Sequence, residues 1–187
     1  MFKNAVELSH FYLENTINKG SIVVDATCGN GNDTLFLDAL VGENGTIFAF
    51  DIQKCAIEST KKRLEEKGIC KNIRYILDGH ENLSKYLANK KADAFIFNLG
   101  YLPKGDHSIQ TKADTTILAI KDALIHLNKE GIILICIYHG KDSGFLERDQ
   151  VLDFLKTLDS HLYNVIIHDY SNKPNHPPIL AVISHNT

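Results

Sequence analysis

The sequence predicts an α/β protein with a seven-stranded, mostly parallel sheet, helices on both faces and an antiparallel last strand. Apolar strand-like runs alternate with helical segments along the chain, as in successive βαβ units. The first run, residues 22–24, leads through a glycine turn into a helix, the order that opens many ligand-binding α/β sheets. The runs 163–168 and 179–184 are separated by a loop too short for a helical crossover, so we expect them to pair antiparallel.

Apolar spacing and turn residues define the elements in order. The runs 94–97 and 132–138 are apolar at every position, as expected for central strands buried on both faces. Ile117, Ile120, Leu124 and Leu127 follow the spacing of one helix face, and 128–131 is expected to be the turn after it. The expected strands are 22–24, 46–50, 73–77, 94–97, 132–138, 163–168 and 179–184, and the expected helices include 5–17, 33–41, one that Gly68 ends, one around 83–87 and one that begins at Glu147 or Asp149.

Composition is that of a single globular domain spanning residues 1–187. The chain has 44% hydrophobic and 23% charged residues, and no apolar run reaches membrane-spanning length, so we expect no membrane partner. The N-terminal residues lack the apolar core of a signal peptide, which favours a cytoplasmic location. The four cysteines form no CxxC pair, and we expect reduced thiols with no metal site. Since the net charge is −3, contact with a nucleic acid would require a local basic patch.

The glycine turn after the first strand carries two acids that indicate the charge of its ligand. Gly29 and Gly31 allow a sharp turn and a close approach of the backbone to a ligand, although the third glycine of a dinucleotide fingerprint is absent. Asp25 and Asp33 bracket the position that a pyrophosphate would occupy, and two carboxylates would repel it. They suit a ligand with an ammonium or a sulfonium, and S-adenosylmethionine carries both. Alternatively, Asp33 only caps the helix and Asp25 only ends the strand.

The next two strands also end in polar residues. Asp51 follows the second strand 26 residues after Asp25, a placement suited to ribose hydroxyls, and Gln53 lies close enough to reach the same ribose. Asp51 could equally cap the following helix. Asp78, Gly79 and His80 follow the third strand and could flank a nucleobase, although a lone histidine is more often structural.

The fourth strand runs into a loop with an amide, an aromatic ring and a proline. The Asn98 amide could accept a hydrogen bond from a substrate amine while Tyr101 stacks on a base. The alternative is an ordinary structured loop. Asp106, His107 or His139 could take a proton from the amine, and the sequence does not choose among them. Because ligands bind at the carboxyl edge of open α/β sheets, we expect all these loops to share one edge.

Five segments together, 25–34, 51–53, 79–81, 98–103 and 175–178, resemble the MnmM (YtqB) family of tRNA methyltransferases, earlier labelled putative rRNA methylase. The strand pattern resembles the Rossmann-like class I S-adenosylmethionine-dependent methyltransferase fold. The resemblance implies S-adenosylmethionine as cofactor and the tRNA anticodon loop as partner. It also implies methylation of the aminomethyl nitrogen of 5-aminomethyl-2-thiouridine at the wobble position. Lys104 stands where the family usually has glycine and Lys141 where it has histidine, which bears on the substrate rather than on the cofactor.

The residues and the resemblance together predict one site. By position, the resemblance implies cofactor contacts at Asn30, Asn32, Asp51, Gln53 and His80 and a substrate shelf at 98–103. The expected cofactor-binding residues are Asp25, Gly29, Asn30, Gly31, Asn32, Asp33, Thr34, Asp51, Gln53, Asp78, Gly79 and His80. The expected catalytic residues are Asn98, Tyr101, Asp106 and His139, and the candidate phosphate contacts are Lys104, Lys112, Lys141 and Lys173.

Three other functions fit parts of this pattern. The methyl acceptor could be ribosomal RNA or a small amine metabolite, because these alternatives differ only in the substrate loops. An NAD-dependent reductase would need a phosphate-binding loop, and Asp33 argues against one. A binding module without catalysis would not need polar residues at the ends of four strands. The sequence leaves open whether the protein forms a homodimer.

Overall fold

The computed structural model describes residues 3–69, 71–103, 105, 108–139 and 144–186, and within them seven strands form one sheet. The strand order is β3-β2-β1-β4-β5-β7-β6. β7 is antiparallel to both β5 and β6, and the other neighbouring pairs are parallel, so the predicted fold class is confirmed. The strands are β1 Ile22–Asp25, β2 Thr46–Asp51, β3 Ile73–Leu77, β4 Ala92–Leu99, β5 Leu127–Ile137, β6 Tyr163–His168 and β7 Ile179–His185.

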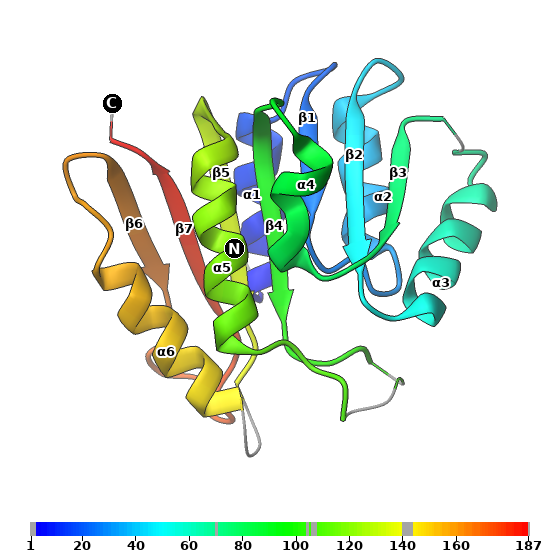
Figure 1. The fold of residues 1–187 in the computed structure, drawn as a ribbon. Helices are drawn as coiled ribbons and strands as arrows, with labels where there is room; N and C mark the ends of the chain where they lie inside the picture. The colour runs from blue at the N-terminus through cyan, green and yellow to red at the C-terminus, as the bar shows by residue number, and fades with distance from the viewer. Residues whose placement is uncertain (1–2, 70, 104, 106–107, 140–143, 187) are drawn as a thin grey trace.

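Helices cover both faces of the sheet, as Figure 1 shows with α1 and α2 behind it and α4, α5 and α6 in front. Alternate residues of the central strands enter opposite cores. Phe95 and Phe97 belong to the core under α5, while Ile96 lies between them in the core under α1 and α2. The helices are α1 Ala5–Thr16, α2 Asn32–Val41, α3 Lys54–Glu65, α4 Leu83–Leu87, α5 Ala113–His126 and α6 Gly144–Lys156, with a 3₁₀ turn at His80–Asn82.

Most predicted boundaries lie within one or two residues of the observed ones, but the region around β4 and β5 differs. The predicted turn at 128–131 is wrong, because β5 already begins at Leu127, which pairs with Ala92. The register then shifts between Ala92 and Ala94, and Asn128 Nδ2 donates to Asp93 Oδ1 at 2.6 Å. With this irregular pairing, β5 includes the residues 128–131 that were predicted to form a turn. β4 also extends to Leu99, so Asn98 lies within the strand, and α6 begins at Gly144, before the predicted start.

The carboxyl ends of β1 to β5 meet at one edge of the sheet, the lower edge in Figure 1. The segment between β4 and α5 leaves this edge, and α6 begins beside it. Tyr101 and Gln110 form an isolated antiparallel bridge within this segment, and its described residues 100–103, 105 and 108–111 are here called the arm. The parallel strands thus bring the ends predicted to carry the site to the same edge.

Candidate cofactor and substrate site

The glycine loop between β1 and α2 is held by α3. Gly31 has a φ of +76°, and a Cβ added there would lie 2.9 Å from the Cα of Thr60. Thr60 Oγ1 donates to the Gly29 carbonyl at 2.9 Å, and Arg63 Nε donates to the Asn30 carbonyl at 2.6 Å. The loop therefore depends on glycine both for its backbone conformation and for the close approach of α3.

Asp25 and Thr34 lie beneath this loop and line neither of the two pockets described below. Asp25 Oδ2 accepts from Thr34 Oγ1 at 2.6 Å, and both side chains are fully buried. Burial, with a smaller contribution from the charge of Asp33, raises the pKa of Asp25 to about 7. Both residues were predicted to bind the cofactor, whereas in the structure their side chains are buried in the core and hydrogen-bond to each other. Gly31 and Gly79 also lie outside the pocket walls.

The first pocket, here called the Asp51 pocket, has a volume of about 280 Å³ and opens over the ends of β1, β2 and β3. Asp51 Oδ2 accepts from the Gly29 amide at 3.0 Å, and Oδ1 accepts from the Gln53 amide at 2.9 Å. Burial raises the pKa of Asp51, while these two backbone hydrogen bonds oppose the shift. The carboxylate is thus fixed in orientation and keeps lone pairs for a ligand. The walls of the Asp51 pocket include Thr27, Gly29, Asp51, Ile52, Gln53, Asp78, His80, Glu81, Asn98, Tyr101, Gln110, Thr111, Lys112 and Thr115.

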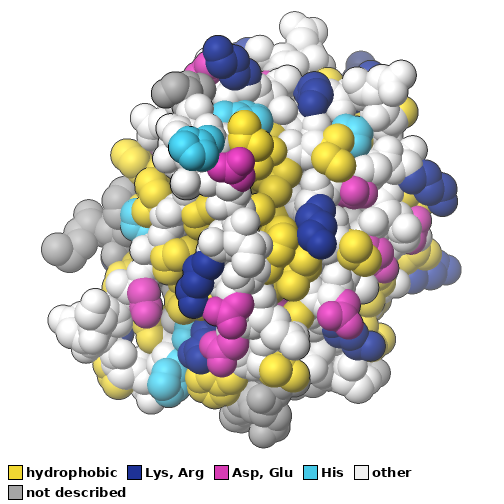
Figure 2. Space-filling model, turned by 60° about the vertical axis from the view of Figure 1, so that its left-hand side comes forward, with side chains coloured by type: hydrophobic (Ala, Val, Ile, Leu, Met, Phe, Trp, Pro, Cys, Tyr) yellow, Lys and Arg dark blue, Asp and Glu magenta, His cyan; other side chains and the backbone are white. Residues whose placement is uncertain are grey.

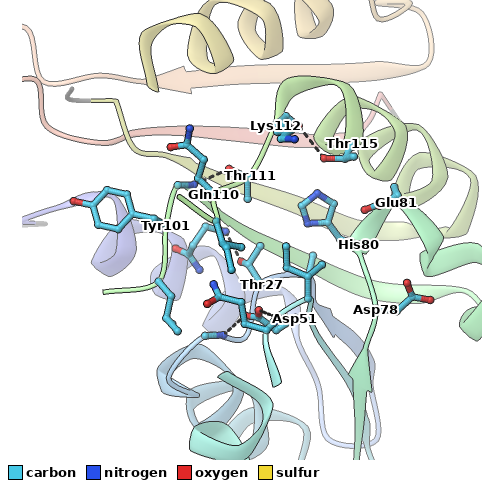
Figure 3. A pocket seen from close by; sticks show the side chains of 18 of the residues that line it. Thr27, Asp51, Asp78, His80, Glu81, Tyr101, Gln110, Thr111, Lys112 and Thr115 are labelled. Atoms are coloured by element: carbon cyan, nitrogen blue, oxygen red, sulfur yellow. Dashed lines mark hydrogen bonds between the residues drawn. The ribbon is translucent and has the colours of Figure 1, made fainter. Parts of the chain in front are cut away.

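His80 lines the same pocket on the side away from Tyr101 (Figure 3). His80 is 8% exposed, and its Nε2 has no hydrogen-bond partner among the described residues. Burial lowers the pKa of His80, which favours the neutral imidazole. A buried polar atom without a partner is costly, so a ligand group that hydrogen-bonds to Nε2 would fit here. Asp78 is already engaged by protein groups, since it accepts from Tyr86 Oη at 2.7 Å.

The second pocket, the His139 pocket, has a volume of about 570 Å³ and adjoins the first. Seven residues line both pockets, so the two hollows meet along the end of β4 and the start of the arm. The shared residues are Thr27, Gly29, Asn98, Gly100, Tyr101, Pro103 and Gln110. The rest of the His139 pocket is lined by Val6, Cys28, Asn30, Asn32, Asp33, Leu99, Tyr138, His139, Gly144, Glu147, Asn175, His176 and Pro178.

Asn98 lies where the pockets meet, and the protein fixes the orientation of its amide. The Asn98 backbone amide donates to Thr27 Oγ1 at 2.7 Å, and Nδ2 donates to Asp33 Oδ2 at 2.7 Å. Because the amide nitrogen is held by a carboxylate, the side-chain oxygen is left to accept a hydrogen bond. Tyr101 stands beside it with 50% of its surface exposed, as a residue that stacks on an incoming base would.

Aromatic rings gather at the far side of the His139 pocket. The ring centroids of His139 and His176 lie 6.0 Å apart, and those of Phe145 and His176 lie 5.3 Å apart. His139 is 6% exposed, and its Nδ1 lies 3.2 Å from the Ile137 carbonyl. The pocket therefore brings together Asn98, Tyr101 and His139 of the four predicted catalytic residues. Asp106, together with His107, Lys104 and Lys141, lies outside the described residues.

Glu147 is a buried acid whose role the sequence did not indicate beyond a helix start. Its Oε2 accepts from Thr111 Oγ1 at 2.7 Å and its Oε1 from Thr116 Oγ1 at 3.0 Å. Thr111 Oγ1 also accepts from the Gly100 amide at 2.8 Å. Burial raises the pKa of Glu147. These contacts connect α6 to the arm over a separation of 36 residues, and no local pattern reveals such a pairing.

The described residues contain neither a metal-binding cluster nor a membrane-spanning helix. No group of three or more His, Cys, Asp or Glu side chains in these ranges is placed to hold a metal ion. Among the described helices, none combines the length and apolar character needed to span a membrane.

Comparison with known proteins identifies the family. A family model described as "Putative rRNA methylase" matches residues 47–184, well over half of the chain. The "tRNA (mnm(5)s(2)U34)-methyltransferase, chloroplastic" of Arabidopsis thaliana is 39% identical over 161 residues, which are 81% of this chain and 59% of the plant protein.

Two crystal structures match nearly end to end. A "putative rRNA-methylase" from Clostridium thermocellum is 48% identical with a TM-score of 0.97, and 99% of each chain is covered. A "putative methyltransferase" from Streptococcus mutans, solved in complex with SAH, is 41% identical with a TM-score of 0.90, again with 99% of each chain covered. On the evidence of the family match and these full-length likenesses, the chain belongs to the "Putative rRNA methylase" family of S-adenosylmethionine-dependent methyltransferases.

Proposed function

We propose that this protein transfers a methyl group from S-adenosylmethionine to the aminomethyl nitrogen of 5-aminomethyl-2-thiouridine at the wobble position of tRNA. The observation that carries the proposal is the junction of two pockets at Asn98, one suited to a nucleoside cofactor and the other open to an acceptor. The choice of acceptor is supported by the name of the Arabidopsis thaliana relative.

The Asp51 pocket fits the adenosine part of the cofactor. Asp51 is held by two backbone amides and can accept from the ribose hydroxyls, with Gln53 beside it. His80 Nε2 is the buried atom that a polar group of the nucleoside would satisfy. Ile52 is 57% exposed at the pocket wall and offers an apolar surface for the flat base.

The methionine part of the cofactor would extend toward the glycine loop, where the two pockets meet. Gly29 belongs to both pockets, and Asn30, Asn32 and Asp33 continue along the wall of the His139 pocket. Asp33 places a negative charge close to where a cationic donor would lie, which favours the sulfonium over its neutral product. These residues were the ones predicted to hold the cofactor, and this assignment remains a proposal.

The protein's part in the chemistry is to hold the acceptor amine in line. S-adenosylmethionine supplies a methyl carbon that bonds to the amine nitrogen as the carbon–sulfur bond breaks, and its electron pair stays on sulfur in S-adenosylhomocysteine. Asn98 Oδ1 can accept one N–H of the amine and so direct the nitrogen lone pair at the methyl group. His139, in the same pocket, could receive the proton that the amine loses, and Asp106 and His107 are the other candidates.

The RNA would enter at the mouth of the two pockets. A wobble base lies in a single-stranded loop and can be turned out of its stack at small cost. Tyr101 is placed to stack on this base, and Lys112 lines the Asp51 pocket where it could meet a phosphate. Lys173 is a second candidate, although its Nζ already donates to the Lys3 carbonyl at 2.7 Å.

The test uses tRNA isolated from a strain that lacks this gene, so that the wobble aminomethyl group is free. The purified protein and labelled S-adenosylmethionine should convert the 5-aminomethyl nucleoside to its N-methyl form, as measured by mass spectrometry of tRNA nucleosides. The Asn98→Ala variant should bind the cofactor but lose transfer. Label that appears only in ribosomal RNA, or only in a small amine, would replace the proposed acceptor.

A further inference from the structure

We propose that His10, on helix α1, is a positioning residue for methyl transfer that acts through Asp33 on the amide of Asn98. The inference rests on the proposed function, because it takes Asn98 to face the acceptor amine. His10 itself lines neither pocket. Helix α1 nevertheless forms part of the substrate wall, since Val6 lies one turn before His10 and lines the His139 pocket.

Asp33 connects the two side chains through its two oxygens. His10 Nε2 lies 2.6 Å from Asp33 Oδ1, and Asn98 Nδ2 donates to Asp33 Oδ2 at 2.7 Å. An ionised carboxylate only accepts hydrogen bonds, so His10 must donate from Nε2 and Asn98 must present its NH₂ group. His10 thereby helps to decide which end of the Asn98 amide faces the pockets.

The His10 ring is fixed by packing. It stacks on Phe36 of α2 with centroids 3.7 Å apart and an angle of 7° between the planes. The side chain of Asp33 is 12% exposed and that of His10 is 26% exposed, so the pair is partly shielded from water. Because Phe36 and Asp33 both belong to α2, the ring is held against the same helix that carries its partner.

This arrangement matters because an amide presents opposite hydrogen-bonding groups at its two ends. With Nδ2 held by Asp33, Asn98 Oδ1 can accept from an amine N–H. If Asp33 turns away, the Asn98 amide is free to rotate and can present a donor, which does not orient the amine. Loss of His10 changes the direction of the Asp33 carboxylate but keeps its charge in the pocket wall. We therefore expect it to slow the transfer step with little effect on cofactor binding.

The test compares His10→Ala with His10→Gln and Tyr12→Phe. We expect His10→Ala to lower kcat for tRNA methylation roughly tenfold, with KM for tRNA and Kd for S-adenosylmethionine changed less than about twofold. His10→Gln should recover most of the rate, since its amide nitrogen can donate to Asp33 from a similar position. Tyr12→Phe is the matched control, because it removes a different side-chain hydrogen bond of α1, the one between Tyr12 Oη and His168 Nε2 at 2.8 Å, which lies outside both pockets.

Two kinetic outcomes overturn the proposal: equal loss of rate in His10→Ala and Tyr12→Phe, or a raised KM with unchanged kcat. A second readout needs no substrate. The Asn98 side-chain NH₂ resonance, assigned by its loss in Asn98→Ala, should shift in His10→Ala and not in Tyr12→Phe. If the wild type fails to methylate tRNA, the proposed function fails, and this resonance still decides whether His10 positions Asn98. An unchanged resonance in His10→Ala contradicts the inference.

Discussion

Asp51 is oriented before any ligand binds, because the Gly29 and Gln53 amides each hold one of its oxygens. We therefore expect Asp51→Ala to weaken S-adenosylmethionine binding by tenfold or more, which corresponds to about 1.4 kcal/mol or more. Isothermal titration calorimetry measures this affinity. Glu58→Ala, an exposed acid on the neighbouring helix α3, is the control and should bind as the wild type does. Unchanged affinity in Asp51→Ala would remove this residue from the cofactor site.

The raised pKa of Asp25 predicts that the free energy of unfolding depends on pH. Burial raises its pKa from 3.8 to about 7, so the folded state holds the proton more tightly than the unfolded state does. Its stabilising contribution is complete below the unfolded pKa and is lost as the pH rises through about 7. Asp25→Asn keeps an oxygen for Thr34 and removes this titration. The free energy of unfolding of the variant relative to the wild type should therefore increase between about pH 4 and about pH 8 in urea titrations. If the free energies of unfolding of the variant and the wild type change in parallel with pH, this prediction is wrong.

Individual site residues could be predicted where they end a strand. The position of Asp51 and Asn98 beside the pockets could be predicted, because parallel strands end at one edge whatever the details of packing. The burial of Asp25 could not be predicted, because a residue's place beside a glycine loop does not say whether its side chain turns outward or into the core. His10 and Glu147 were missed because their partners lie 23 and 36 residues away and only tertiary packing brings them together.

At the scale of elements, the loop between β1 and α2 is shaped by α3. Gly31→Ala would introduce a Cβ 2.9 Å from the Thr60 Cα at a φ of +76°, whereas Gly20→Ala has a φ of +90° and no atom within 4 Å. Both variants carry the backbone strain, and only Gly31→Ala carries the steric clash. We expect Gly31→Ala to lose about 1–3 kcal/mol more of the free energy of unfolding than Gly20→Ala. Equal losses in chemical denaturation would show that α3 can shift away from the loop.

The packing of helix α6 against the arm could not be predicted from the apolar spacing of either segment. Val151 and Leu155 of α6 are both buried, at the four-residue spacing of one helix face. The contact of Glu147 with Thr111 and Thr116 depends on how α6 is rotated and shifted against α5, which periodicity does not specify. Likewise, the extension of β5 to Leu127 depends on the irregular pairing with β4, which forms only within the sheet.

At the scale of the whole molecule, alternation of strands and helices was enough to predict the architecture. Crossover connections between parallel strands are nearly always right-handed, which leaves few ways to order the strands once the glycine loop is assigned to the first one. The short connection from β6 to β7 then requires an antiparallel pair, and β7 lies between β5 and β6. These rules are general, so the sheet and the edge that carries the site were predictable, whereas the shape of the pockets depends on side-chain packing that the rules do not describe.

The charge of the whole molecule predicts how an RNA substrate would be held. The net charge is −3, and on the face shown in Figure 2 Lys and Arg are mixed with Asp and Glu rather than gathered into a field of one sign. We therefore expect a shallow dependence of tRNA affinity on salt, set by a few local cations at the carboxyl edge of the sheet.

Lys112 and Lys129 allow this expectation to be tested within one chain. Lys112 lines the Asp51 pocket, whereas Lys129 is near the start of β5, at the opposite edge of the sheet. If Lys112 meets a phosphate of the single-stranded loop, Lys112→Ala should reduce the slope of log affinity against log salt by about 0.7, while Lys129→Ala leaves it unchanged. The measurement is fluorescence anisotropy of labelled tRNA at several salt concentrations. Equal slopes for the two variants would place the RNA away from Lys112, and a steep slope retained by both would mean that cations elsewhere hold it.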